Sequence, residues 1–171
     1  MRVEVGEMYA GLDLQAPDMP KAGPEQLNPP NGSFLVGYED GVAVCCGGIK
    51  RLDAESCELK RMYVVPDQRG RGVARMLLTA LEDRARELGY VLSRLDTGPK
   101  QQGARHLYES AGYTAVANFN GNPVATYFAE PGYAGSDQFT REGDHEGLAT
   151  EGMDIGRDGA QPLDELGRVF H

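Results

Sequence analysis

The residues that point most clearly to chemistry form a loop rich in glycine and arginine, Val64 to Ala74, which reads V-V-P-D-Q-R-G-R-G-V-A. An apolar strand precedes this loop, and apolar residues at helical spacing follow it. Backbone N–H groups converge at the start of a helix that follows such a loop, and the helix dipole favours an anion there. Gly70 and Gly72 carry no Cβ, so a ligand can approach the backbone closely. The loop therefore predicts a phosphate-binding cradle.

Two common kinds of phosphate-binding loop fit this sequence poorly. A P-loop ends in Gly-Lys-Ser/Thr, which is absent here. A Rossmann turn needs a third glycine where Arg75 stands, and its first strand is nearly all apolar, whereas this strand carries Lys60 and Arg61. A Rossmann-like nucleotide binder would use Asp96 as its ribose-binding acid, and the charged strand argues against it.

A second motif, Gln101 to Tyr113, reads Q-Q-G-A-R-H-L-Y-E-S-A-G-Y. Together the two motifs resemble the Gcn5-related N-acetyltransferase (GNAT) superfamily. Arg69 to Ala74 matches its acetyl-CoA loop, Gln/Arg-x-x-Gly-x-Gly/Ala, and the second motif resembles its signature Asn-x-x-Ala-x-x-Leu-Tyr-Glu-x-x-Gly-Phe/Tyr. Gln101 stands where the family usually has asparagine, and its amide retains the capacity to hydrogen-bond the cofactor arm. The resemblance covers Ser33 to Glu130.

The resemblance implies that acetyl-CoA is the co-substrate, and no metal-ligand spacing is present. The loop amides from Gly70 onward would hold the pyrophosphate, with arginine side chains adding positive charge beside it. The strand at Met62 to Val64 would separate from its neighbour near the thioester, so that one backbone amide could bind the carbonyl oxygen as an oxyanion hole does. The cofactor-binding residues expected on this basis are Met62, Tyr63, Val64, Arg69, Gly70, Arg71, Gly72, Val73, Ala74, Arg75 and Gln101.

Tyr108 is the residue expected to protonate the coenzyme A thiolate. The ordinary pKa of a phenol lies a little above that of a thiol, which suits a general acid for this leaving group. The alternative is a core aromatic packed beside Leu107 and Ala111.

The general base is left open between Glu58, Asp96 and a water chain. Glu58 lies on the strand that leads to the loop, where several family members carry a carboxylate, and Asp96 ends the next strand. Both acids can instead be ion-pair partners of Lys60, Arg61 or Arg94. Since side chains alternate along a strand, Glu58, Lys60, Met62 and Val64 are expected to share one face.

The pattern of elements predicts an α/β fold of the α+β type. It would be a single GNAT-like domain with a mixed, mostly antiparallel central sheet flanked by helices. Strand 91–96 should run parallel to strand 56–65, because a helix crossover joins them. The other expected elements are strands 33–38 and 42–49 joined by a turn at 39–41, helix 70–88 ended by Gly89, helix 102–111, and a closing hairpin of 113–119 with 125–130.

Three regions differ in composition. Residues 1–32 form a short proline-rich extension with room for one short helix near 7–14 and a short strand at 2–5. Residues 33–133 form the acetyl-CoA-binding domain. Residues 134–171 form an acidic, glycine-rich tail whose composition cannot bury enough apolar surface to order itself. We expect the tail to be flexible and dispensable, unless a short helix near 163–169 docks on the domain or on a second copy of the chain as a homodimer.

Charge and cysteine content limit the partners and the compartment. The formal net charge of −9 argues against nucleic acid or an anionic membrane as the main partner. The chain has no stretch of apolar residues long enough for a spanning helix, and its first residues lack the build of a signal peptide. Cys45, Cys46 and Cys57 are best explained as reduced core thiols of a cytoplasmic protein, with a vicinal disulfide or a metal site as the minor alternatives.

These observations predict an acetyl-CoA-dependent N-acetyltransferase that acts on a primary amine of a small molecule or a peptide. The alternative is a GNAT-like module that binds acyl-CoA without turnover. The identity of the amine is not encoded in either motif, because the residues that line the acceptor pocket lie outside them.

Overall fold

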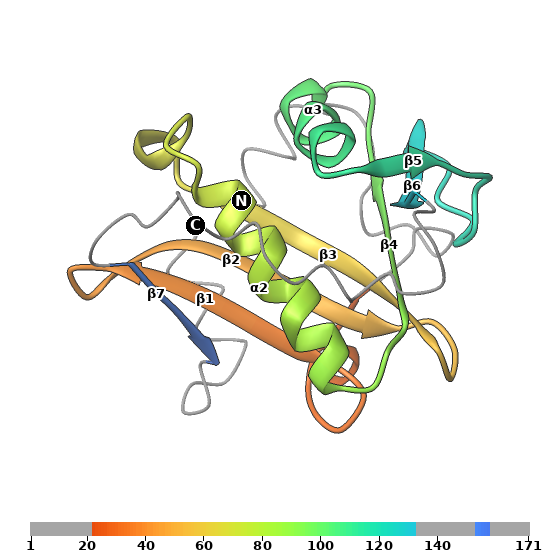
Figure 1. Ribbon diagram of the computed structural model, residues 1–171, viewed down its shortest axis with the longest axis horizontal. Helices are drawn as coiled ribbons and strands as arrows, with labels where there is room; N and C mark the ends of the chain where they lie inside the picture. The colour runs from red at the N-terminus through yellow and green to blue at the C-terminus, as the bar shows by residue number, and fades with distance from the viewer. Residues whose placement is uncertain (1–21, 133–152, 158–171) are drawn as a thin grey trace.

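The strands form one mixed sheet, with the strand order β5-β6-β4-β3-β2-β1-β7 (Figure 1). The computed structural model of the protein describes residues 22–132 and 153–157. β3 and β4 pair in parallel, and the other neighbouring strands pair antiparallel. The expected mixed, mostly antiparallel sheet is therefore confirmed. The strands are β1 (Ser33–Glu39), β2 (Val42–Arg51), β3 (Ser56–Val64), β4 (Leu92–Thr97), β5 (Tyr113–Ala115), β6 (Tyr127–Pro131) and β7 (Met153–Arg157).

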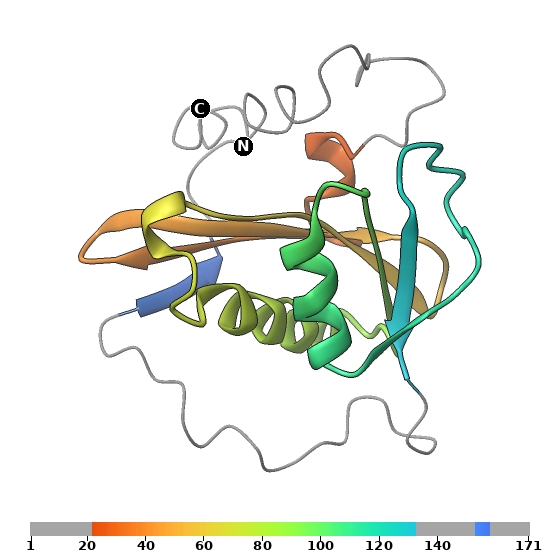
Figure 2. The same ribbon diagram turned by 90° about the horizontal axis from the view of Figure 1, so that it is seen from above.

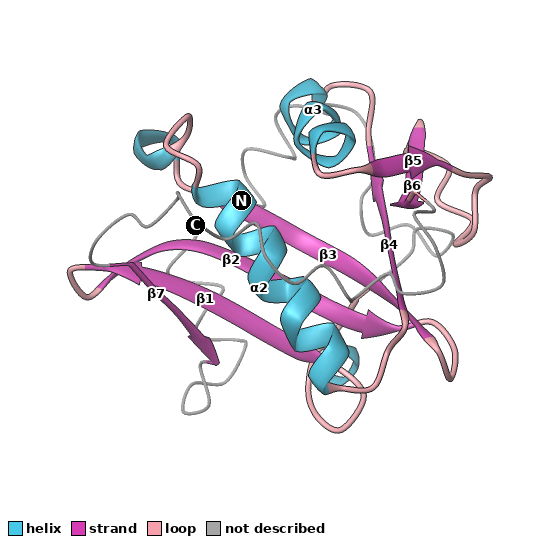
Figure 3. Cartoon of the chain, in the orientation of Figure 1, coloured by secondary structure: helices cyan, strands magenta, loops and turns pink. Residues whose placement is uncertain are grey.

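Two α-helices, α2 (Val73–Glu87) and α3 (Gln102–Ser110), flank this sheet, with short 3₁₀ helices η1 (Pro24–Gln26) and η2 (Pro66–Gln68) (Figure 3). Figure 2 shows α2 lying along one face of the sheet and η1 on the other face. The buried side of α2 packs into the main core against β2 and β3. Because its apolar residues recur every three or four positions, they form one stripe. That stripe consists of Val73, Leu77, Leu78, Leu81 and Ala85.

Glycines set both ends of α2. Gly70 and Gly72 have φ values of +76° and +84°, so the helix begins at Val73 and not at Gly70 as the apolar pattern predicted. At the other end, the Gly89 N–H donates to the carbonyl of Arg86 (2.9 Å). The Tyr90 N–H donates to the carbonyl of Ala85 (3.0 Å). This is a Schellman motif with the left-handed glycine that such an end requires, and the predicted stop at Gly89 is confirmed.

The closing hairpin is shorter than predicted. β5 ends at Ala115 and β6 begins at Tyr127, so residues 116–126 form a loop where the pattern predicted strand up to 119 and again from 125. The asparagines of this loop bond to backbone groups within it, which offers the chain an alternative to a regular ladder.

A β-bulge interrupts the pairing of β2 with β3. Cys46 pairs with Tyr63 and Gly48 with Lys60, so Gly47 alone faces both Arg61 and Met62. Arg61 adopts a positive φ of +56°, which is unusual for a residue with a side chain. A bulge reverses the side-chain alternation of the strand beyond it.

The expectation that Glu58, Lys60, Met62 and Val64 share one face is therefore wrong. Met62 and Val64 pack in the core on the α2 side. Glu58 and Lys60 lie on the opposite side, where a Cβ on Gly48, the partner of Lys60, would meet Leu27 and Phe34.

The expectations for both chain ends fall largely on residues outside the described ones, including the strand at 2–5 and the helices near 7–14 and 163–169. Residues 153–157 belong to the segment expected to be flexible, yet they form β7 and pair with β1 from Leu35 to Glu39. Within the described residues, no helix is long and apolar enough to span a bilayer.

We expect β7 to contribute to stability. A chain ending at Gly132 would leave the edge of β1 unpaired, whereas a chain ending at Arg157 would keep the ladder. The shorter chain should melt at least about 3 °C below the longer one, since roughly 1 kcal/mol of lost pairing shifts a domain of this size by that amount. Equal melting temperatures for the two chains would show that β7 adds nothing.

The three cysteines are free and buried, as the sequence predicted. Burial raises the pKa of the Cys45 thiol to about 11 and that of the Cys46 thiol to about 12. Burial, with the Glu58 charge, raises the pKa of Cys57 to about 12. At pH 8 the reactive thiolate is therefore a very small fraction of each.

Native protein should consequently react with a thiol reagent such as DTNB at pH 8 at least about 100-fold more slowly than a free thiol. The rate should still be rising at pH 9, since all three raised pKa values lie above it. Denatured protein should release all three equivalents at once. A fast native equivalent would contradict the buried placement of at least one thiol.

Candidate functional site

The two parallel strands part in the middle of the sheet. β3 and β4 pair only where Ser56 to Glu58 face Leu92 to Arg94. Beyond that point β4 pairs with β6, and the two strands diverge (Figure 1). The gap between residues 59–64 of β3 and 95–97 of β4 is called the V-shaped opening below. The expected separation of strand 62–64 from its neighbour is thus present.

One backbone amide points into the V-shaped opening. The Val65 N–H donates to the carbonyl of Val44 on β2 (3.0 Å). Successive amides of a strand point to opposite edges, so the Val64 N–H is directed away from β2, toward β4. This is the position that the expected oxyanion-binding amide requires.

The glycine-rich loop, which the sequence predicts to be an anion cradle, lies open at the end of β3. A Cβ built on Gly70 would meet no atom within 4 Å, so the backbone there is accessible. The carbonyl of Gly72 accepts the N–H groups of Arg75 (2.9 Å) and Met76 (3.1 Å). The amides of Val73 and Ala74 precede these in the first turn, where a helix has no internal acceptor for them. The geometry fits a phosphate group.

The side chains of Arg69, Arg71 and Arg75 contact three different elements. Arg69 Nε donates to the carbonyl of Val64 (3.0 Å), and its guanidinium lies 5.6 Å from the centre of the Tyr63 ring. Arg71 pairs with Glu39 at the end of β1 (3.3 Å). Arg75 Nη2 donates to Ser110 Oγ of α3 (2.6 Å). These contacts hold the loop to β3, β1 and α3 as well as placing positive charge near the cradle.

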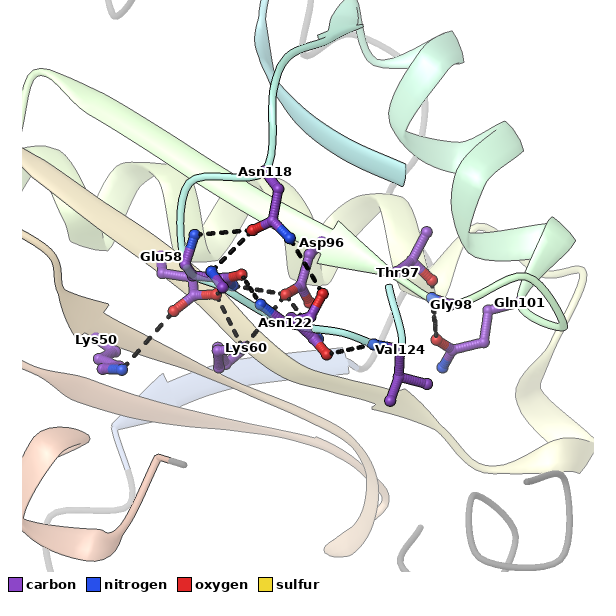
Figure 4. Close-up of polar contacts among 12 residues, drawn as sticks. Lys50, Glu58, Lys60, Asp96, Thr97, Gly98, Gln101, Asn118, Asn122 and Val124 are labelled. Atoms are coloured by element: carbon purple, nitrogen blue, oxygen red, sulfur yellow. Dashed lines mark hydrogen bonds and ion pairs between the residues drawn. The ribbon is translucent and has the colours of Figure 1, made fainter. Parts of the chain in front are cut away.

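The Gln101 side chain stabilises the turn between β4 and α3. Its Oε1 accepts the Thr97 hydroxyl (2.9 Å) and the Gly98 N–H (3.0 Å), as Figure 4 shows. Its amide oxygen is therefore engaged within the chain, which leaves the NH₂ group as the part that can meet a cofactor.

Tyr108 lies at the V-shaped opening on the α2 side. It is 6% exposed, and its hydroxyl donates to Met62 Sδ (3.7 Å), next to the bulge in β3. Burial and the negative charge of Asp96 raise the pKa of this phenol well above its ordinary value. The match to a thiol that the sequence argument assumed is therefore not present in the free protein, and Tyr108 acts as a hydrogen-bond donor that keeps its proton.

Glu58 and Asp96, the two candidate bases, meet on the other face of the sheet (Figure 4). Lys60 Nζ lies 2.8 Å from Glu58 Oε1 and 3.7 Å from Asp96 Oδ2, so its ammonium spans the opening between the strands. Lys50 Nζ of β2 is 4.0 Å from Glu58 Oε2, an atom that has no hydrogen-bond donor among the described residues. The expected ion pairing with Lys60 is present for both acids.

Two asparagines from the 116–126 loop complete this cluster. Asn120 Nδ2 donates to both Glu58 Oε1 (2.5 Å) and Asp96 Oδ2 (2.6 Å). Asn122 Nδ2 donates to Asp96 Oδ2 (3.0 Å). Sequence reasoning missed both residues, because the run Asn-Gly-Asn-Pro reads as a turn and nothing local ties it to β3.

The two carboxylates differ in their access to solvent. Glu58 is fully buried, whereas the Asp96 side chain is 12% exposed. The described contacts of the Asp96 carboxylate all involve Oδ2. Asp96 is therefore the carboxylate that can reach a ligand, and Glu58 is the buried partner that fixes Lys60 and Asn120. Within residues 22–132, no group of three or more His, Cys, Asp or Glu side chains could hold a metal ion.

Comparison with known proteins agrees with this geometry. The model of the acetyltransferase (GNAT) family matches residues 7–113. The chain belongs to this family. It is 34% identical over 137 residues to an "IAA acetyltransferase" of Azospirillum brasilense, an alignment that covers 74% of this chain and 82% of the relative.

A second relative is the uncharacterised N-acetyltransferase YsnE of Bacillus subtilis, with 30% identity over 131 residues, 74% of this chain and 83% of the relative. Among solved structures, a GNAT family acetyltransferase from Elizabethkingia anophelis with acetyl-CoA bound superposes with a TM-score of 0.52 at 18% identity. That superposition covers 71% of this chain and 90% of the other, and it shows that the GNAT fold is shared.

Replacing Gly72 with valine should weaken coenzyme A binding at least about 10-fold, because a branched side chain would stand beside the cradle. The substitution also strains the backbone, since the φ of Gly72 is +84°. Gly89→Val is the matched control, with a φ of +88° at the far end of the same helix. Calorimetry of both folded variants separates the effects, and equal affinities in the two would remove the loop from the binding site.

Proposed function

We propose that this protein is an acetyl-CoA-dependent N-acetyltransferase that transfers an acetyl group to a primary amine of a small molecule or a peptide. The observation that carries the proposal is the V-shaped opening. It has a buried phenol on one side, a cluster of two paired carboxylates on the other, and the predicted anion cradle at its end. The buried free thiols fit a reducing compartment such as the cytoplasm.

The thioester would lie in the V-shaped opening, with the pyrophosphate at the amides of Gly70 to Ala74. The Val64 N–H would then donate to the thioester carbonyl oxygen and stabilise the negative charge that develops on it. An amide held by the sheet needs no reorganisation for this task.

Asp96 would take the proton from the incoming ammonium group. The neutral amine then attacks the thioester carbon, and the C–N bond forms to give a tetrahedral intermediate. One proton of the amine reaches solvent through Asp96, and a second leaves nitrogen as the intermediate collapses and the C–S bond breaks. The coenzyme A sulfur gains a proton, so the overall reaction gives amide, thiol and one proton.

Tyr108 would donate a hydrogen bond to the departing sulfur. The Asp96 charge favours the neutral phenol, so the same carboxylate that accepts a proton also keeps the opposite donor protonated. Such a division between an anionic base and a neutral donor allows both roles at one pH.

A non-catalytic acyl-CoA-binding module is the second candidate. It is favoured by the extent to which the cluster is internally paired, since Glu58 is buried and both acids contact Lys60. Release of free thiol from acetyl-CoA in the presence of a panel of amines separates the two. Coenzyme A binding without amine-dependent thiol release would support the module.

Tyr108→Phe should lower kcat about 100-fold, as expected when one preorganised hydrogen-bond donor to developing charge is removed, and leave coenzyme A affinity unchanged. Tyr113→Phe is the matched control. Its hydroxyl donates to Glu82 Oε1 (2.7 Å) and lies 2.9 Å from Ser93 Oγ, in the same core. Steady-state rates and calorimetry provide the readouts. Tyr108 would have no catalytic role if both variants lost activity equally.

A further inference from the structure

We propose that Asn120 is a positioning residue that bridges the carboxylates of Glu58 and Asp96. In this pair, Asp96 is the carboxylate that accepts the proton of the acceptor amine. This inference rests on the proposed function, which assigns Asp96 the proton of the amine. It goes beyond that assignment because it gives a role to a loop that neither motif contains.

Glu58 and Asp96 approach the same Asn120 nitrogen, and two neighbouring acids repel each other unless donors or positive charges pair with them. Asn120 Nδ2 lies 2.5 Å from Glu58 Oε1 and 2.6 Å from Asp96 Oδ2. An amide NH₂ has two hydrogens and no capacity to accept, so it bonds both oxygens only when neither carries a proton there. The bridge therefore favours the state in which Asp96 is ready to accept a proton.

The direction of the Asn120 amide is set by the loop. Its Oδ1 accepts the Asn122 N–H (3.0 Å), which leaves Nδ2 facing the carboxylates. Asn118 Oδ1 accepts the N–H groups of Asn120 (3.2 Å) and Gly121 (2.8 Å). Phe119 packs edge-on against Phe128, with ring centres 5.9 Å apart. These contacts explain why a loop residue can place a donor with the precision that a buried carboxylate pair needs.

Other charged groups also face the pair. Lys60 contacts both acids, and Lys50 approaches Glu58 from β2. Tyr108 interacts with Asp96 from α3. Arg94, the neighbour of Asp96 on the same face of β4, is paired with Glu130 of β6 (2.8 Å). Lys60 supplies positive charge to both carboxylates, and Asn120 supplies uncharged donors to the same two oxygens.

Asn120→Asp tests the bridge with a side chain of the same shape. Its Oδ1 can still accept the Asn122 N–H, but the donor to the carboxylates becomes a third carboxylate. Asn118→Asp is the matched control, because it adds the same charge to the same loop and keeps the acceptor for the two backbone amides, and it loses the single bond from Asn118 Nδ2 to the Asn122 carbonyl (3.2 Å). Asn120→Ala removes the donors without adding charge, and it replaces Asn120→Asp if that variant does not fold.

The test measures kcat as a function of pH with one acceptor amine throughout. In Asn120→Asp, the fall of kcat at low pH should move to higher pH by at least about one unit. Asn120→Ala should move it in the same direction, and Asn118→Asp should leave it in place. Coenzyme A affinity should be unchanged in all three variants. An unchanged pH dependence in Asn120→Asp, or an equal shift in Asn118→Asp, would overturn the proposal.

A second readout does not depend on turnover. In Asn120→Asp the new carboxyl lies beside two other carboxylates, which disfavour its anionic form in the folded state. Its pKa in the folded protein is therefore expected to lie above its pKa in the unfolded chain. Its stability cost is then absent at low pH and grows as pH rises through and beyond the unfolded value. The melting temperature should approach that of the wild type near pH 4 and fall below it at pH 8, while Asn118→Asp shows no such trend.

These two readouts separate failure of the inference from failure of the proposed function. If the melting trend appears and no amine is acetylated by the wild type, the bridge is real and the assigned reaction is wrong. A melting difference that does not change with pH would overturn the bridge whether or not the enzyme turns over.

Discussion

The parting of β3 and β4 after the Glu58–Arg94 pair is the constraint on which the rest of the structure depends. Two adjacent parallel strands would otherwise satisfy each other along their whole length, and the sheet would have no opening. Beyond residue 58, the edge of β3 that faces β4 is no longer paired with that strand. Such exposed backbone is costly unless something else occupies the gap. The site is therefore a consequence of where pairing stops.

Three features mark the region where the strands separate. β4 exchanges its partner and pairs with β6, which draws it away from β3. The bulge at Arg61 and Met62 takes β3 out of regular register and turns Met62 toward α2 and Tyr108. On the opposite face, Lys60 and Asn120 span the opening and join the acids of the two strands. The positive φ of Arg61 is consistent with backbone strain stored at a functional position.

The polar cluster of Glu58, Asp96, Lys60 and Asn120 adds little to the stability of the fold. Two carboxylates near a buried strand would destabilise the fold if left unpaired, and pairing them with ammonium and amide groups offsets that cost without making the cluster a large source of stability. A hydrophobic cluster of similar volume would serve stability at least as well. The presence of charge here is better explained by the chemistry proposed for Asp96 than by the needs of the fold.

The amino-acid sequence alone determined the elements that depend on local pattern. The glycine-rich loop with its helix, the stop at Gly89, the hairpin of β1 with β2 and the parallel β3–β4 pair all follow from spacing and turn chemistry, and they made the family recognisable. The alternation of side chains along β3 does not predict their faces beyond Arg61. A β-bulge depends on the pairing with the partner strand, and the local sequence does not indicate it. For the same reason the sequence predicts strands up to 119 and from 125 around a short turn, where the structure has one loop over residues 116–126. Only the tertiary structure decided that Asn120 reaches both Glu58 and Asp96, that Glu58 is fully buried while Asp96 is partly exposed, and that burial and the Asp96 charge raise the pKa of Tyr108. Each of these is a contact or a desolvation between residues far apart in the chain, and sequence periodicity carries no information about such distances.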